Sequence, residues 1–199
     1  SLIEMWKDAP KGIFPDPQSV GMATPNMIAY QRYNALLMLM GGLKGGELTN
    51  ASPIGGMAAV IGLDEVPTRE VCAAAGVVLA NLNCPSQLVI SGETDKIAKA
   101  VELAKVKGAR RAIPLPVAGA YHSPLMASAQ PKLRTVLASV KLSVPAVPVV
   151  ANVTGLPHGG PGEICDRLVE QVTASVRWEE SMRYLLAQGF TRFIELGPG

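Results

Sequence analysis

Residues 57–117 read MAAVIGLDEVPTREVCAAAGVVLANLNCPSQLVISGETDKIAKAVELAKVKGARRAIPLPV. This stretch contains four short apolar runs typical of strands, at residues 57–63, 77–82, 87–91 and 111–117. Two segments with helical character lie between the runs. One is about Arg69–Ala75, where Thr68 could cap the helix, and the other is Glu93–Lys107, which ends before Gly108. The predicted order of elements is therefore β-α-β-β-α-β.

That order is the ferredoxin-like split βαβ arrangement, and we assign residues 56–116 to such a subdomain. After residue 117 the pattern changes to helices that alternate with short apolar strands. The helices are predicted at Ser123–Val140, 163–173 and 176–188, and the strands at Val147–Ala151 and Thr191–Leu196. This alternation is typical of a parallel sheet covered by helices, so the fold class is α/β. Residues 1–55 are irregular apart from one helical candidate, Asn26–Met40.

The composition excludes several classes of protein. Apolar residues make up 48% of the 199 residues and the net charge is only +2, which is sufficient for a packed core and argues against a nucleic-acid binder. No apolar run approaches the length of a membrane span. The three cysteines form no C-x-x-C pair, so neither a disulfide framework nor a metal site is expected. We expect a reducing compartment, which is the cytoplasm or an organelle matrix such as that of a plastid or mitochondrion.

His122 is the residue most consistent with chemistry. It stands between the predicted end of a strand and a helix start, where Ser123 is a suitable cap and Pro124 a suitable first helical residue. Ligands bind at the carboxyl ends of strands in α/β sheets, and the positive end of a helix would keep the imidazole neutral. The residues alone leave two interpretations about equally open, a general base and a histidine packed beside the helix.

The other candidates are less specific. His158 lies in a Pro-Gly-rich surface turn, and Cys84 lies in a turn without a neighbouring base, so both are expected to be inert. The serine elbow G-x-S-x-G does not occur anywhere in the sequence. A basic cluster either forms a solvated face or attracts an acidic partner; its members are Lys105, Lys107, Arg110 and Arg111.

Several motifs resemble one family. Asn81–Gly92 (NLNCPSQLVISG) resembles the N-x-N-S-P-G-Q-x-V-I-S-G stretch of malonyl-CoA:acyl-carrier-protein transacylases, and Gly119–Met126 (GAYHSPLM) resembles their G-A-F-H-S-x-L-M motif. Three further matches follow in the family's order: Val147–Gly155 (VPVVANVTG), Gln171 with Val176–Trp178 (VRW), and Phe193–Gly199 (FIELGPG). The resemblance covers about residues 55–199, whereas residues 1–54 fit poorly.

The resemblance implies a reaction. In the family, a serine in a G-H-S-x-G elbow attacks the thioester of malonyl-CoA, and a histidine accepts its proton and passes it to the CoA thiol. The malonyl-serine ester then reacts with the phosphopantetheine thiol of acyl-carrier protein, which is ping-pong nucleophilic catalysis in fatty acid biosynthesis. His122 aligns with that histidine. Gln171 aligns with the glutamine whose carbonyl orients it, without the full charge of a triad carboxylate.

The resemblance also implies an architecture and partners. Residues 1–55 and 117–199 would form an α/β-hydrolase-like domain beside the ferredoxin-like subdomain. Malonyl-CoA and acyl-carrier protein would be the partners, and no metal or bound organic cofactor would be needed. Lys44 stands where the family has an arginine for the malonyl carboxylate, and it keeps the charge but loses the bidentate fork. Asn81, Asn83 and Asn152 are candidates for lining the site, or equally for hydrogen bonds at turns and strand ends.

The N-terminal part departs from the family. Phe14–Met22 (FPDPQSVGM) looks like a shortened F-P-G-Q-G-S-Q-S-V-G-M and lacks the oxyanion-hole glutamine. The nucleophilic serine is absent with its strand and helix, so the parallel sheet is expected to be incomplete. Two explanations remain: an incomplete form of an active transacylase, which the exposed sheet edges favour, and a truncated paralogue that only binds acyl-carrier protein or CoA. Besides the transacylase and the binding module, a third possible function is a thioester hydrolase with His122 as its base.

Overall fold

The structure is a computed structural model that describes residues 55–117 and 119–194. The described residues up to Met182 belong to one compact unit, and those from Arg183 onward belong to a second, so each is described by itself. The predicted helix at Asn26–Met40 and the candidate Lys44 lie outside the described residues.

One four-stranded antiparallel sheet is the centre of the first unit. Its strands are β1 (Gly55–Ile61), β2 (Val78–Cys84), β3 (Gln87–Glu93) and β4 (Arg111–Pro114), in the spatial order β2-β3-β1-β4. Helix α4 (Glu65–Ala75) connects β1 to β2, and α5 (Thr94–Val106) connects β3 to β4. The predicted β-α-β-β-α-β order of elements is therefore present.

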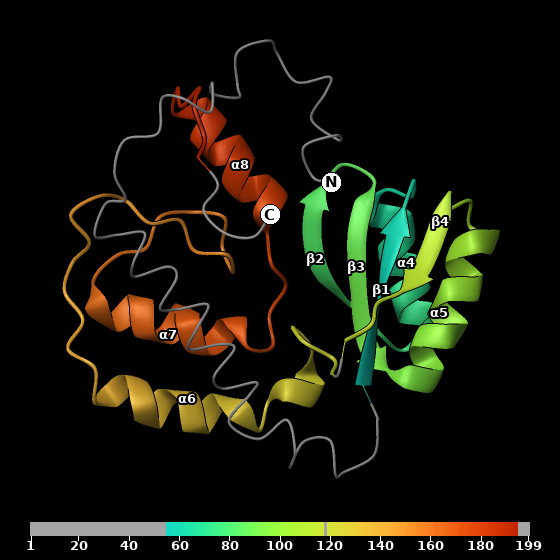
Figure 1. Cartoon of the computed structure of the whole chain (residues 1–199), viewed down its shortest axis with the longest axis horizontal. Coiled ribbons are helices and arrows are strands. Elements are labelled where there is room, and N and C mark those ends of the chain that lie inside the picture. The colour runs from blue at the N-terminus through green and yellow to red at the C-terminus, as the bar shows by residue number, and fades with distance from the viewer. Residues whose placement is uncertain (1–54, 118, 195–199) are drawn as a thin grey trace. The chain divides into compact units, whose positions relative to one another are not determined.

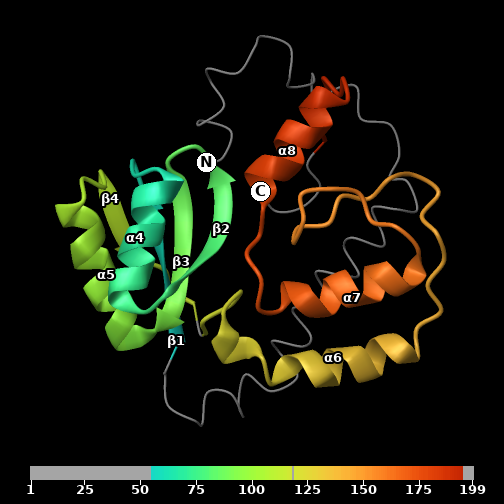
Figure 2. The ribbon, with the colours of Figure 1, turned by 180° about the vertical axis from the view of Figure 1, so that it is seen from behind.

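Helices α4 and α5 cover one face of this sheet, as the two opposite views show (Figures 1 and 2). The strand register explains which side chains meet them, because Ile90 on β3 pairs with Ala58 on β1 and with Leu79 on β2. These three side chains belong to the main core cluster together with buried residues of both helices, which include Val71, Ile97, Ala100 and Val101. The opposite face carries a smaller cluster of Met57, Ala80 and Val89.

Two element boundaries differ from the sequence prediction. Helix α4 begins at Glu65 and not near Arg69, because Pro67 is compatible with the first helical turn. Thr68 is therefore not a cap; it lies inside the helix, where its hydroxyl donates to the Asp64 main-chain oxygen at 2.8 Å. Strand β4 ends at Pro114 and not at Val117, and proline cannot donate a hydrogen bond to a sheet ladder.

Four helical elements follow the sheet in the described part of the chain. The predicted helix at Ser123–Val140 is in fact a short 3-10 helix, η2 (Pro124–Met126), followed by α6 (Ala129–Ala138). Helix α7 (Pro161–Gln171) confirms the helix predicted at 163–173 and lies beside α6 (Figure 1). Helix α8 (Trp178–Ala187) confirms the helix predicted at 176–188.

The two strands predicted after residue 117 are wrong as far as they are described. Within Val147–Ala151 only Val150 forms an isolated bridge, to Pro157, and residues 191–194 contain no strand. Pro148 removes a donor from the first segment, and a strand requires a neighbour that completes its hydrogen bonds. Among residues 55–117 and 119–194 the only sheet is the antiparallel one, so no parallel sheet is present there.

Candidate active site

The backbone around His122 is held in an uncommon conformation. His122 has a φ of 56°, in the left-handed region that few residues other than glycine adopt. The buried Ser123 hydroxyl donates to the Ala120 main-chain oxygen at 2.6 Å and accepts from the Leu125 amide at 3.3 Å. Ser123 is thus the predicted cap, although it caps η2. A Cβ atom on Gly55 would lie 2.7 Å from the Ala120 nitrogen, so β1 needs a glycine there.

Gln171, the last residue of α7, contacts the imidazole ring directly. The main-chain oxygen of Gln171 lies 3.1 Å from Nδ1 of His122. The side-chain Nε2 of Gln171 lies 3.2 Å from the same Nδ1, and it donates to the Ala174 main-chain oxygen at 3.0 Å. The Gln171 residue is only 3% exposed. The structure therefore brings together the two residues proposed for catalysis, which are 49 positions apart in the sequence.

The environment keeps His122 neutral near pH 7. Burial of the ring lowers the pKa of His122 below its ordinary value, and hydrogen bonding to the main chain of Gln171 and Ala174 raises it only in part. The neutral state does not come from a helix N-terminus, as the sequence predicts, because the helix that follows has only three residues. Burial is the main cause. With Nδ1–H donated to the Gln171 oxygen, the other ring nitrogen keeps a lone pair that can accept a proton.

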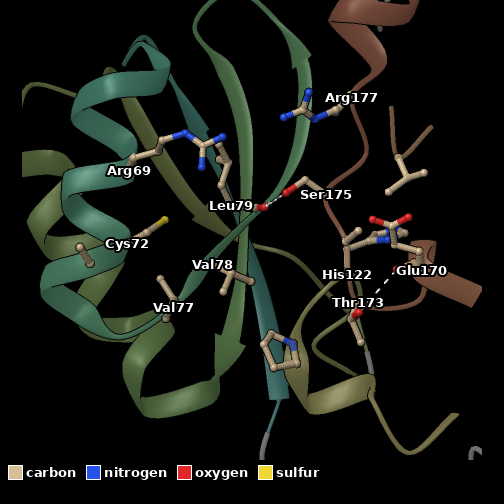
Figure 3. Close-up of a pocket in the computed structure, with 14 residues that line it drawn as sticks. Arg69, Cys72, Val77, Val78, Leu79, His122, Glu170, Thr173, Ser175 and Arg177 are labelled. Carbon is tan, nitrogen blue, oxygen red and sulfur yellow. Dashed lines mark hydrogen bonds between the residues drawn. The ribbon is translucent and has the colours of Figure 1, made fainter. Parts of the chain in front are cut away.

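A pocket of about 630 Å³ opens beside His122. Arg69 reaches toward it from α4 and Arg177 from the segment before α8, and Glu170 also lines it (Figure 3). Its apolar wall includes Cys72, Val77, Val78, Leu79 and Pro124. Sequence reasoning missed the three charged residues, because nothing in their spacing separates them from ordinary surface charges.

The segment after Gln171 is attached to the free edge of β2. The Ser175 hydroxyl donates to the Leu79 main-chain oxygen at 2.6 Å, and the Val176 amide donates to the Ala80 oxygen at 2.8 Å (Figure 3). Val176 in turn accepts from the Leu82 amide at 2.9 Å. This attachment places the end of α7, and with it Gln171, next to the sheet.

Two of the three asparagine candidates contact the segment that follows α7 through their backbones. Asn81 forms a parallel bridge with Val176, and the Asn152 main-chain oxygen accepts from the Arg177 amide at 2.8 Å. Asn83 lies further along β2. None of the three is among the residues that line the pocket, so the structure brings Asn81 and Asn152 near the site without making them part of the pocket wall.

The remaining candidates for chemistry are two cysteines and His158. Burial raises the pKa of the Cys72 thiol to about 11, and burial together with the Glu179 carboxylate raises the pKa of Cys84, so neither supplies a thiolate near pH 7. His158 is half-buried in its turn, and its amide donates to the Val149 oxygen at 2.8 Å. In the described part of the chain no three metal-ligating side chains gather, and no helix there is long and apolar enough to cross a membrane.

Comparisons with known proteins identify the family. The family model described as "Acyl transferase domain" matches residues 31–198. The malonyl CoA-acyl carrier protein transacylase of Bacillus subtilis strain 168 is 44% identical over 164 residues, which cover 78% of this chain and 52% of that protein. The polyketide biosynthesis protein ThaF of Burkholderia thailandensis is 44% identical over 159 residues, covering 78% of this chain and 14% of ThaF.

Solved structures agree with this assignment. An acyl carrier protein S-malonyltransferase from Vibrio cholerae matches with a TM-score of 0.72 and 39% identity, covering 73% of this chain and 49% of that one. A complex of a type II polyketide-synthase acyl-carrier protein with its malonyl-transacylase matches with a TM-score of 0.73 and 34% identity, covering 78% and 52%. This chain belongs to the acyl transferase domain family. It spans about half the length of the curated malonyl transacylases that it matches.

Proposed function

We propose that this protein transfers a malonyl group from malonyl-CoA to the phosphopantetheine thiol of acyl-carrier protein, through an acyl-serine intermediate. The observation that carries the proposal is the contact between His122 and Gln171 in a chain of the acyl transferase family. Relatives named malonyl CoA-acyl carrier protein transacylase and a neighbour solved with an acyl-carrier protein support the choice of substrate and partner.

In this mechanism His122 is the general base and Gln171 orients it. The neutral ring donates Nδ1–H to the Gln171 main-chain oxygen, which leaves Nε2 free to take the proton of the attacking serine. The resulting imidazolium then protonates the departing CoA thiol. The later attack of the carrier thiol on the malonyl-serine ester uses the same two proton transfers in reverse order. The reaction needs neither a metal nor a bound organic cofactor, because CoA enters as a substrate.

The finer architecture is part of the same proposal. The strand order β2-β3-β1-β4, with both helices on one face, supports a ferredoxin-like subdomain at residues 56–116. Residues 1–55 and 117–199 would form the α/β-hydrolase-like domain. Lys44 would face the malonyl carboxylate. Asn81, Asn83 and Asn152 would contribute only indirectly, because none of them lines the pocket beside His122. The reducing compartment remains a prediction; the three free cysteines fit it, and the bacterial relatives favour the cytoplasm over an organelle matrix.

The direct test is a transfer assay on the full-length product of the gene. Malonyl-CoA and phosphopantetheinylated acyl-carrier protein are the substrates, and the readout is the mass of the carrier. We expect His122→Ala to lose about 10²–10⁴-fold in transfer rate, the usual contribution of a general base. His158→Ala is the matched control and should retain the rate, because His158 does not line the pocket. Equal rates for His122→Ala and the wild type would contradict the proposal.

A second candidate function is a non-catalytic module that binds acyl-carrier protein or CoA. One observation favours it, since the pattern G-H-S-x-G does not occur in the 199 residues. The exposed basic residues Arg110 and Arg111 would then attract the acidic carrier, whereas Lys105 and Lys107 are paired with Glu102 and Glu70. Binding of the carrier that falls with rising salt, in the absence of any acyl transfer, would select this function.

A further inference from the structure

Gln171 presents two chemically opposite groups to one nitrogen of His122. The main-chain oxygen lies 3.1 Å from Nδ1, and the side-chain Nε2 lies 3.2 Å from it. A carbonyl oxygen can only accept a hydrogen bond, and a carboxamide nitrogen can only donate one. The first contact therefore requires a proton on Nδ1, and the second requires a bare Nδ1. In a neutral imidazole the two contacts exclude each other.

The two alternatives correspond to the two tautomers of the ring. When Nδ1–H donates to the Gln171 oxygen, Nε2 carries the lone pair and can act as a base. When the Gln171 carboxamide donates to Nδ1, the proton sits on Nε2, and that nitrogen cannot accept another. We propose that the side-chain carboxamide of Gln171 is a positioning group that holds part of the His122 population in the Nε2–H tautomer. This inference rests on the proposed function in giving His122 the role of base.

The surroundings of the carboxamide support its role as a donor to both neighbours. Nε2 donates to the Ala174 main-chain oxygen at 3.0 Å, so its second hydrogen remains for Nδ1. The opposite atom, Oε1 of Gln171, is buried and has no hydrogen-bond partner. A buried acceptor without a partner is costly, and the contacts of Nε2 are what hold the group in this orientation. The reverse orientation would place Oε1 against the Ala174 oxygen, where two acceptors repel.

The ring is also shielded from competing influences. His122 is partly buried, and burial disfavours its charged form, so the neutral tautomers are the species that matter near pH 7. Three charged side chains line the same pocket, Arg69, Glu170 and Arg177, and each is paired with a charged neighbour on its own helix or at its start. The polar contacts made with the His122 ring are therefore those of Gln171, through its main-chain oxygen and its carboxamide, together with a hydrogen bond to the main chain of Ala174.

Nitrogen NMR of the histidine rings tests the proposal without an activity assay. Protonated and bare ring nitrogens give well-separated signals, and the 199-residue sequence has only two histidines, His122 and His158. The spectra are recorded at about pH 8, above the ordinary histidine pKa of roughly 6.5. The variant is Gln171→Met, which keeps the length and the main-chain oxygen but removes the donor. We expect the His122 signals to shift toward the Nδ1–H tautomer.

The direction of the shift separates this effect from simple loosening. A ring that becomes exposed to water favours the Nε2–H tautomer, which is the preference of free imidazole side chains. A shift of Gln171→Met toward Nε2–H, or no shift at all, would therefore overturn the proposal. Gln130→Met is the matched control. Gln130 donates to the Val169 oxygen and to Thr173 Oγ1, both at 3.1 Å, and makes no contact with His122, so its removal should leave the tautomer unchanged.

A second variant keeps the test decisive if Gln171→Met does not fold. Gln171→Glu places an acceptor opposite Nδ1, so it should also favour Nδ1–H, and an Nε2–H ring in this variant would refute the geometry. The His158 signals report whether each variant keeps its native structure. Failure of the wild type to transfer malonyl would remove the catalytic role of His122 and leave the tautomer result standing. Active enzyme with an unchanged tautomer in Gln171→Met would remove only the present inference.

Discussion

At the scale of single residues, the site depends on a backbone conformation that His122 adopts at a cost. A φ of 56° costs an ordinary side chain roughly 1–2 kcal/mol, because its Cβ crowds the following carbonyl group. The hydrogen bonds of Ser123 on either side hold the turn in place. In this conformation the ring lies at the end of α7, where the main-chain oxygen of Gln171 can accept a hydrogen bond from Nδ1. Strained residues of this kind are concentrated at functional sites.

This strain predicts an inverted order of stability for two small substitutions. Alanine normally stabilises a chain relative to glycine, but at a positive φ the order should reverse. We expect His122→Gly to be more stable than His122→Ala by about 1 kcal/mol in urea unfolding. At Gln130, inside α6, the usual order should hold, with alanine better by about 1 kcal/mol. Greater stability of His122→Ala than of His122→Gly would show that the turn is not strained.

Burial of the two histidines predicts a pH dependence of stability. The pKa values of His122 and His158 are both lowered in the folded protein, mainly by burial. As the pH falls below about 6.5, the unfolded chain takes up protons that the folded chain does not, so folding stability decreases. We expect the free energy of unfolding to fall between about pH 7 and pH 5. The fall should be smaller in His122→Asn, whose asparagine tolerates the positive φ. If the free energy of unfolding of the double variant His122→Asn/His158→Asn falls with pH as steeply as that of the wild type, burial of the histidines is not the cause.

At the scale of secondary-structure elements, the junction between α7 and β2 fixes the position of Gln171. Ser175 contributes a 2.6 Å hydrogen bond to Leu79 there, and the segment 171–177 contains no proline to restrict its backbone. We expect Ser175→Ala to cost about 1 kcal/mol in the free energy of unfolding. Ser139→Ala removes a similar bond, to the Val136 oxygen, at an exposed helix end, and should change stability by less than about 0.5 kcal/mol. Equal effects of the two variants would mean that the junction is not a structural tether.

The sheet core allows a second comparison within one residue type. Ile90 on β3 is fully buried among side chains of α4, α5 and the neighbouring strands, whereas Ile113 on β4 is 44% exposed. We expect Ile90→Ala to cost about 2–5 kcal/mol, because it leaves a cavity under both helices. Ile113→Ala should cost much less, and chemical denaturation of both variants measures the difference. Similar losses of stability in Ile90→Ala and Ile113→Ala would mean that these two side chains are not packed as the structure shows.

The same elements show what the sequence could and could not predict. The order of elements over residues 57–117 was predictable, because apolar runs and turn residues alternate there with little ambiguity. The absence of the strand expected at Val147–Ala151 was not predictable, since apolar content alone does not reveal whether a neighbouring strand exists. Periodicity could locate His122 near an element boundary, but its pairing with Gln171 across 49 positions came only from the family resemblance. Arg69 and Arg177 carried no signal, because only the tertiary structure places them beside one pocket.

At the scale of the whole molecule, the proposed function rests on the match to the acyl transferase family and on one residue pair, His122 and Gln171. The alignment with the Bacillus subtilis relative covers 78% of this chain but only 52% of that protein, and the family-model match over residues 31–198 includes His122 and Gln171. An acyl-enzyme also needs a nucleophile, which the family carries in its G-H-S-x-G elbow. The decisive property of the protein is therefore whether it forms a covalent malonyl intermediate that depends on His122.

The most direct test is a measurement of intact mass. The purified full-length protein is incubated briefly with malonyl-CoA, then denatured, and its mass is determined. The account predicts an increase of one malonyl group that survives denaturation, disappears when acyl-carrier protein is added, and is absent in His122→Ala. A wild-type mass that does not change with malonyl-CoA, or an adduct that forms equally in His122→Ala, would contradict the central claim. In the first case the protein would be a binding module, and in the second His122 would not be its base.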